Sequence, residues 1–287
     1  MGWLAFIISS AVTLSLYDIC KKHSVSGNRA FEVLLMTSAS GFLSVLAVLA
    51  FRGDLGATMA IGTKTFLLLA AKSAIVGASW SFAYWALKTL PVTIMGPIRA
   101  TGPIWTTLVA ILFLSEWPTA LQTAGFAITF AGCIAFSFAT KREGFSLKTP
   151  SIILAILATL FGSASALYDK LLLQKLSIPP LTVLVWFMGG MCVIYLIACL
   201  IARKFDSTPL KWRVTIPAVG ILLALSDFLY FTAISYSDAR ISIISTIRRT
   251  STIGTFIIGG AIFAERNLWR KGLALTAILA GVILLTI

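Results

Sequence analysis

The sequence predicts an all-α membrane protein with ten transmembrane helices, arranged as two inverted repeats of five. Three observations lead to this fold class. The chain of 287 residues is 59% hydrophobic and only 11% charged, with a mean hydropathy of +0.97, whereas a soluble domain needs a more polar surface. Its apolar runs have about the 20 residues that span a bilayer as a helix. Its two halves share polar positions at a nearly constant offset.

Charged residues, prolines and polar clusters divide the chain into ten apolar segments. In the first half we expect helices over residues 3–20, 30–51, 65–87, 91–115 and 119–139. In the second half we expect them over 151–174, 180–202, 214–237, 240–264 and 268–287. A β-barrel does not fit, because the runs are about twice strand length and lack strict alternation. The links between them are too short for a domain outside the membrane.

Two matches between the halves indicate an internal duplication. The pair Tyr17-Asp18 recurs 151 residues later as Tyr168-Asp169, and Arg99 in PIRATGP recurs 149 residues later as Arg248 in TIRRTST. We therefore predict one repeat over 1–145 and a second over 146–287. Each repeat has five helices, an odd number, so the second copy enters the membrane from the opposite side. Inverted repeats are the plan of many secondary transporters.

The net charge of +13 is better explained as a membrane topology signal than as a nucleic-acid binding surface, because the basic residues gather in short links between apolar segments. Links after the first, third, fifth, seventh and ninth segments carry 14 basic residues, and the other links carry 5. The positive-inside rule then places both termini outside the cytoplasm.

The stretch YWALKTLPVTIMGPIRATGPIWTTLVAILFLSEW and its weaker echo YFTAISYSDARISIISTIRRTSTIGTFIIGGAIFAER carry a family likeness. With them the chain resembles the ten-span EamA type of the drug/metabolite transporter superfamily. The resemblance implies a basket of helices around a central cavity, with 119–139 and 268–287 packed peripherally. It also implies alternating-access transport of small metabolites and cytoplasmic termini, which leaves the orientation open. We expect a multi-pass protein of a bacterial plasma or inner membrane.

Charged residues at membrane depth are the first functional candidates, because lipid makes them costly. We expect Asp18 to meet Arg99 near one mouth of the cavity, and Asp169 to meet Arg248 near the other. Snorkelling of each side chain to its interface is the alternative. Asp227 lies near the midplane without a counterpart in 65–87 and can carry a coupling proton, or else it forms a structural ion pair with Arg248 or Arg249. The predicted gating or coupling residues are Asp18, Arg99, Asp169, Asp227 and Arg248.

Aromatic residues beside these charges complete the predicted binding site. Mid-span Trp and Tyr prefer a cavity or a hydrogen-bond partner, although packing or lipid contact is the simpler alternative. The predicted substrate-binding or cavity-lining residues are Tyr17, Trp80, Tyr84, Arg99, Tyr168, Asp227, Tyr230, Arg248 and Arg249. Aromatic, acidic and basic groups together favour a zwitterion such as an amino acid. Paired arginines leave organic anions, phosphorylated metabolites or nucleotide-like compounds as the alternative.

The function predicted from these features is secondary transport of small amphipathic metabolites, since no GxxxxGK[ST] motif for ATP is present. We expect no catalytic residues, cofactor or metal site, and the alternatives from other classes are a membrane-embedded enzyme and a structural protein. The expected partners are a small-molecule substrate and the lipid bilayer, without nucleic acid, and a monomer is compatible with this function. Glu116 and Glu265 end matching segments and are expected to be structural. Glycines such as Gly132 and Gly281 are expected to let helices approach closely.

Overall fold

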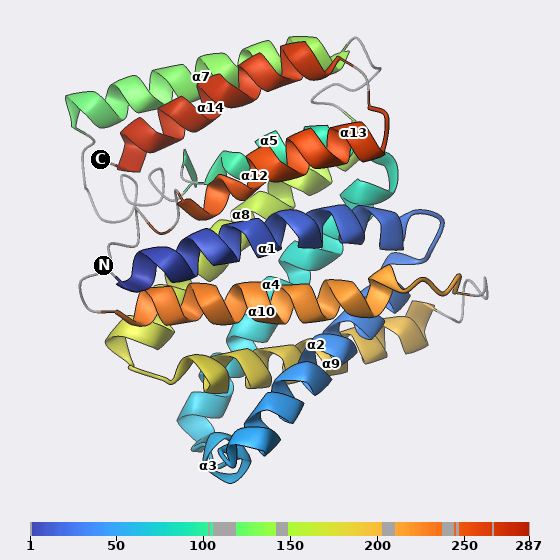
Figure 1. The fold of residues 1–287 in the computed structure, drawn as a ribbon, viewed down its shortest axis with the longest axis vertical. Coiled ribbons are helices and arrows are strands. Elements are labelled where there is room, and N and C mark those ends of the chain that lie inside the picture. Colours follow the sequence, from blue (N-terminus) through green and yellow to red (C-terminus); the bar gives the residue numbers. More distant parts are fainter. Residues whose placement is uncertain are drawn as a thin grey trace.

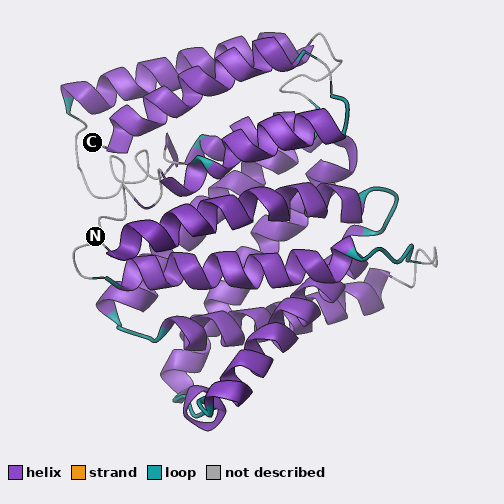
Figure 2. Cartoon of the chain, in the orientation of Figure 1, coloured by secondary structure: helices purple, strands orange, loops and turns teal. Residues whose placement is uncertain are grey.

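The computed structural model describes residues 2–102, 104–105, 119–141, 149–202, 210–236, 244, 247–265 and 267–286, and these form helices and loops without strands (Figures 1 and 2). The long helices are α1 (Gly2–Val25), α2 (Ala30–Arg52), α4 (Thr63–Thr89), α7 (Ala120–Lys141), α8 (Pro150–Lys170), α9 (Pro180–Ala202), α10 (Thr215–Ser235) and α14 (Leu268–Thr286). Shorter pieces are α3 (Leu55–Met59), α5 (Val92–Ala100), η1 (Leu171–Lys175), α12 (Ser251–Gly254), η2 (Thr255–Gly259) and α13 (Gly260–Ile262).

Seven helices in the described part of the chain are long and apolar enough to cross a membrane: α1, α2, α4, α7, α8 continued by η1, α9 and α10. The all-helical fold and the two-repeat architecture thus fit the sequence prediction, but the count of ten spans is not established. The segment predicted over 91–115 begins as α5 and continues into 106–118, outside the described residues. The one predicted over 240–264 is described as α12, η2 and α13, with 240–243 and 245–246 outside. The predicted repeat boundary at 145 also lies outside, within 142–148.

Hydrogen bonds fix the relative directions of the helices. Ser24 of α1 donates to Thr215 of α10 at 2.8 Å, so the end of α1 meets the start of α10. The Lys22 ammonium donates to the Leu87 and Leu90 carbonyls at the end of α4 (2.7 and 2.6 Å). Thr89 at the same end of α4 contacts Ser151 at the start of α8 (2.5 Å). Helix α1 therefore runs toward the face from which α8 departs, which is the inversion expected of the two repeats.

We call these two ends of the bundle the Val25 face and the Gly2 face. Both chain ends lie on the Gly2 face (Figure 1). The contacts between helices repeat across the two halves: α1 packs on α10 as α8 packs on α4, and α2 packs on α10 as α9 packs on α4. Helices α7 and α14 pack on each other at one edge of the bundle (Figure 1). A pseudo-twofold arrangement of this kind surrounds the bundle's centre with α1, α4, α8 and α10.

Glycine permits the close crossing of α2 and α10. A Cβ added at Gly220 would overlap the backbone of α2 at the Thr37 carbonyl and the Gly41 amide. Ser40 secures the same crossing by donating to the Pro217 carbonyl at 3.2 Å. Small residues bring helix backbones together in lipid, where van der Waals contact replaces the hydrophobic effect. The predicted glycines at the α7–α14 contact behave alike, because a Cβ at Gly132 or Gly281 would also overlap backbone atoms.

We expect Gly220→Ala to lower the free energy of unfolding by about 1–3 kcal/mol, because the added methyl group meets backbone that cannot rotate away. The apparent melting temperature in detergent, followed by tryptophan fluorescence, measures this loss. Gly56→Ala is the matched control, because a Cβ there meets nothing within 4 Å. Equal melting temperatures for the two variants would contradict the assigned crossing.

Candidate functional site

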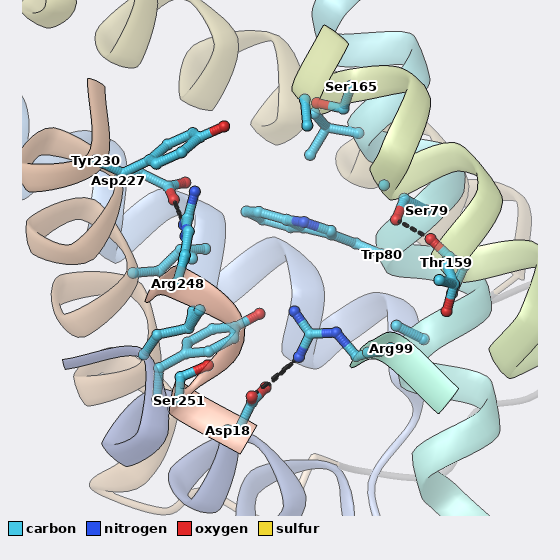
Figure 3. A pocket seen from close by; sticks show the side chains of 18 of the residues that line it. Asp18, Ser79, Trp80, Arg99, Thr159, Ser165, Asp227, Tyr230, Arg248 and Ser251 are labelled. Carbon is cyan, nitrogen blue, oxygen red and sulfur yellow. Dashed lines mark hydrogen bonds and ion pairs between the residues drawn. The ribbon is translucent and has the colours of Figure 1, made fainter. Parts of the chain in front are cut away.

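A polar cavity of about 170 Å³ lies inside the helix bundle (Figure 3). Its walls come from α1, α4, α5, α8, α9 and α10, together with residues 248–252 of the last segment before α14. Three aspartates, two lysines and three arginines line it: Asp18, Asp169, Asp227, Lys21, Lys72, Arg99, Arg248 and Arg249. Both repeats contribute to this set, so the cavity lies at the repeat interface, where such transporters hold their substrates.

Asp18 is the centre of the first charged cluster. Arg99 Nη1 donates to both of its carboxylate oxygens, at 2.7 and 3.0 Å. Lys21, one turn further along α1, donates to Oδ1 at 2.7 Å. The Lys21 ammonium also lies 4.4 Å from the centre of the Tyr17 ring, a cation–π contact. One carboxylate thus balances two cations and ties α1 to α5.

Asp169 forms the second cluster with a residue that the sequence analysis did not select. Its carboxylate accepts from Lys72 of α4, and both side chains are almost fully buried. The Lys72 ammonium also lies 5.0 and 5.1 Å from the ring centres of Phe187 and Phe231. The sequence did contain a signal for this pair. Lys72 is a lysine inside the apolar segment 65–87, and a charge at membrane depth needs a partner.

Asp227 forms the third cluster with Arg248, whose guanidinium lies 3.8 Å from the centre of the Tyr230 ring. The expected contact between Asp169 and Arg248 is therefore wrong in its partners: Asp169 bonds Lys72, and Arg248 bonds Asp227. The reason is that Lys72 and Asp227 have no equivalents in the other repeat. Lys72 binds Asp169, and Asp227 binds Arg248, whereas the repeat symmetry alone predicted that Asp169 and Arg248 would bind each other.

The three clusters occupy two levels of the bundle. Asp18 precedes the end of α1 by seven residues, about 10 Å from the Val25 face at ~1.5 Å per residue. Asp227 precedes the end of α10 by eight residues, about 12 Å from the Gly2 face. Lys72 follows the start of α4 by nine residues, about 14 Å from that same face. The Asp18 cluster therefore lies toward the mouth at the Val25 face, and the Asp169 and Asp227 clusters lie toward the mouth at the Gly2 face.

The predicted aromatic residues divide between the cavity and its surroundings. Tyr17, Trp80, Tyr84 and Tyr230 line the cavity, and Trp80 projects across it between Arg99 and Arg248 (Figure 3). Tyr168 is not among the lining residues, and its hydroxyl donates to the Leu68 carbonyl at 3.1 Å. Neighbouring residues of a helix point about 100° apart, so when Asp169 faces inward Tyr168 faces α4.

Glu265 fills the structural role expected of it. Its carboxylate accepts from the backbone amides of Val92 and Thr93, at 2.8 and 3.1 Å, and from the Thr93 hydroxyl. Pro91 precedes this helix start, so Glu265 satisfies amides that have no partner within α5. Its repeat counterpart Glu116 lies outside the described residues.

An inverted helical bundle around a charged cavity is the architecture of many secondary transporters. Residues 1–138 and 149–287 each match the EamA-like transporter family. The chain belongs to this family, and it is accordingly a multi-pass membrane protein and a secondary transporter of small molecules.

Solved structures match the fold, while no curated protein matches the chain. A crystal structure titled only as that of a protein aligns with a TM-score of 0.65 and 15% sequence identity, over 96% of each chain. At that identity the likeness establishes the fold alone.

The buried pair Lys72–Asp169 gives a direct test of the site's electrostatics. Asp169→Asn strands an ammonium in a buried environment, and we expect it to cost about 3–5 kcal/mol of stability. The double variant Lys72→Met with Asp169→Leu removes both charges and should recover most of that loss. Thermal unfolding in detergent measures both effects.

The exposed pair Arg52–Asp54 provides the control for this series, because both of its side chains are about half exposed (56% and 51%). Asp54→Asn should change the melting temperature little, since exposed pairs contribute at most about 1 kcal/mol. A melting temperature for Asp169→Asn equal to that of Asp54→Asn would contradict the buried pair.

Proposed function

We propose that this protein moves small amphipathic zwitterions, such as amino acids, across a bacterial plasma or inner membrane by alternating access. The observation that carries the proposal is the composition of the cavity wall. Carboxylates, guanidinium groups, ammonium groups and aromatic faces converge there at membrane depth. A zwitterion needs both signs of charge on its binding site, and an amphipathic one also needs an apolar surface.

The size and centre of the cavity support a small substrate. Its volume of about 170 Å³ lies below the roughly 300–1,000 Å³ of pockets for drug-sized ligands. The Trp80 indole extends over its middle, and Phe187 packs edge-on against the indole with ring centres 6.4 Å apart. An indole held in this way offers one face to the ammonium or the apolar part of a substrate.

The two levels of charge support an alternating mechanism. The Asp18–Arg99 pair joins α1 to α5 toward the Val25 face, whereas Lys72–Asp169 joins α4 to α8 toward the Gly2 face. Asp227–Arg248 lies toward the Gly2 face too. We assign these pairs as the contacts that open and close in turn on the two sides of a central substrate.

Uptake into proteoliposomes from a metabolite mixture, followed by mass spectrometry, tests the transport proposal. We expect zwitterionic amino acids to accumulate above protein-free vesicles, and Trp80→Ala to lower their flux about tenfold, because one aromatic contact contributes roughly 1–2 kcal/mol. Trp85→Ala is the control on the same helix, since Trp85 is 45% exposed and does not line the cavity. Absence of any flux, or equal loss in both variants, would refute the proposed role.

The basic-residue count also predicts the orientation, with the Val25 face toward the cytoplasm. Cysteines at the two ends of α10, Tyr236→Cys and Trp212→Cys, test it in a background without native cysteines. Both positions are exposed (39% and 63%). An impermeant maleimide should label position 236 in intact cells and position 212 only after permeabilisation. The reverse pattern would favour the cytoplasmic termini that the family resemblance implies.

A further inference from the structure

The formal charges of the cavity wall do not balance. Five basic side chains face three carboxylates among the residues that line it, which leaves a surplus of two positive charges. Lys21 and Arg99 share Asp18, and Lys72 and Arg248 have an aspartate each. Arg249 has no carboxylate partner in the described part of the chain.

Arg249 is held in position by the backbone of the other repeat. Its Nη1 donates to the Arg99 carbonyl at 3.1 Å. In a regular α-helix that carbonyl would accept from the amide of residue 103, but Pro103 has no N–H to donate. The proline thus removes the usual helical donor to this carbonyl, and the guanidinium of the opposite repeat donates to it instead. One N–H of the five on Arg249 is accounted for by this bond.

Gly102 makes room for the guanidinium. A Cβ added at this glycine would lie 2.5 Å from Arg249 Nη2 and 3.0 Å from Cζ. The planar group therefore packs against bare backbone, one edge bonded to the Arg99 carbonyl. Arg99 and Arg248 line the same cavity as Arg249. Three guanidinium groups thus converge on the cavity, and carboxylates of the protein neutralise two of them.

We propose that Arg249 is the seat for the anionic group of the substrate, a carboxylate or a phosphate. This inference rests on the proposed transport function, and names the part of the substrate that the cavity fixes. A cation at membrane depth without a counter-ion is unfavourable. An incoming anion would give Arg249 the partner that Asp18 gives Arg99 and Asp227 gives Arg248. The guanidinium fork matches a carboxylate or phosphate oxygen pair in geometry. The apolar part of the ligand then lies along Trp80.

Four probes with one aromatic skeleton separate the relevant chemistries: L-phenylalanine, 3-phenylpropionate, phenyl phosphate and phenethylamine. Binding is measured as the ligand-induced rise in melting temperature of the purified full-length protein in detergent. We expect the anionic and zwitterionic probes to stabilise the wild type and the amine not to. Phenylpropionate and phenyl phosphate show which oxyanion the seat prefers.

Three variants assign the effect to Arg249. Arg249→Gln should weaken binding of the anionic probes roughly 10–100-fold, the range for charge-assisted hydrogen bonds. Arg249→Lys keeps the charge but loses the fork, and should recover part of that affinity. Gly102→Ala keeps every charge and displaces the guanidinium, so it should also weaken binding. Arg52→Gln, on the exposed surface, should behave as the wild type.

The outcomes distinguish the anion seat from the transport function. Anionic probes that stabilise Arg249→Gln as much as the wild type would overturn the proposal, as would stabilisation by the amine alone or by none of the four. A loss of melting temperature in Arg249→Gln with unchanged probe affinity would mean that Arg249 only supports the α5 backbone, and would overturn it as well. Arg249-dependent binding without flux of any compound would uphold the seat and refute transport.

Discussion

The structure depends on one constraint: each aspartate buried at membrane depth meets a positive charge from another element. Asp18 meets Arg99 of α5, Asp169 meets Lys72 of α4, and Asp227 meets Arg248 of the segment before α12. The first two pairs join elements far apart in the chain, and the third joins α10 to the segment that follows it. The pairs therefore fix how the helices surround the cavity, and at the same time line it with polar groups. Stability and a binding surface arise from the same contacts.

Backbone peptide groups at membrane depth need partners just as charges do. In the segment after Pro91, prolines interrupt the regular helical hydrogen bonds. Pro97 and Pro103 remove two amide donors from GPIRATGP, and lipid supplies no replacement. The Arg99 carbonyl obtains its donor from Arg249 of the second repeat. The Val92 and Thr93 amides at the start of α5 obtain their acceptor from Glu265, also of the second repeat. Backbone groups of the first repeat that lack a regular helical partner thus bind side chains of the second repeat.

The sequence could reveal the elements and most of the charged site, because both depend on local or repeated patterns. Apolar length defined the long helices to within a few residues. Asp18 could be paired with Arg99 because the first segment ends on the side of the membrane where the fourth begins. The partners of Asp169 and Arg248 could not be read in this way. Lys72 and Asp227 interrupt the symmetry, and which of several buried charges pair depends on helix rotation and tilt. The direction of Tyr168 depends equally on rotation, since its repeat counterpart Tyr17 does line the cavity.

The departures from symmetry make the two levels of the cavity electrically different. Toward the Gly2 face, two carboxylates meet two cations in separate pairs. Toward the Val25 face, Asp18 alone serves Lys21 and Arg99. Opening the Asp18–Arg99 contact would leave the carboxylate bonded to Lys21 and only Arg99 without its partner, whereas opening Lys72–Asp169 would leave both charges without their partners. A contact is less costly to open when its carboxylate keeps a second cation than when the carboxylate loses its one partner. Under the gating proposed above, we expect the unequal distribution of lysines and aspartates between the repeats to give the two sides unequal barriers to opening.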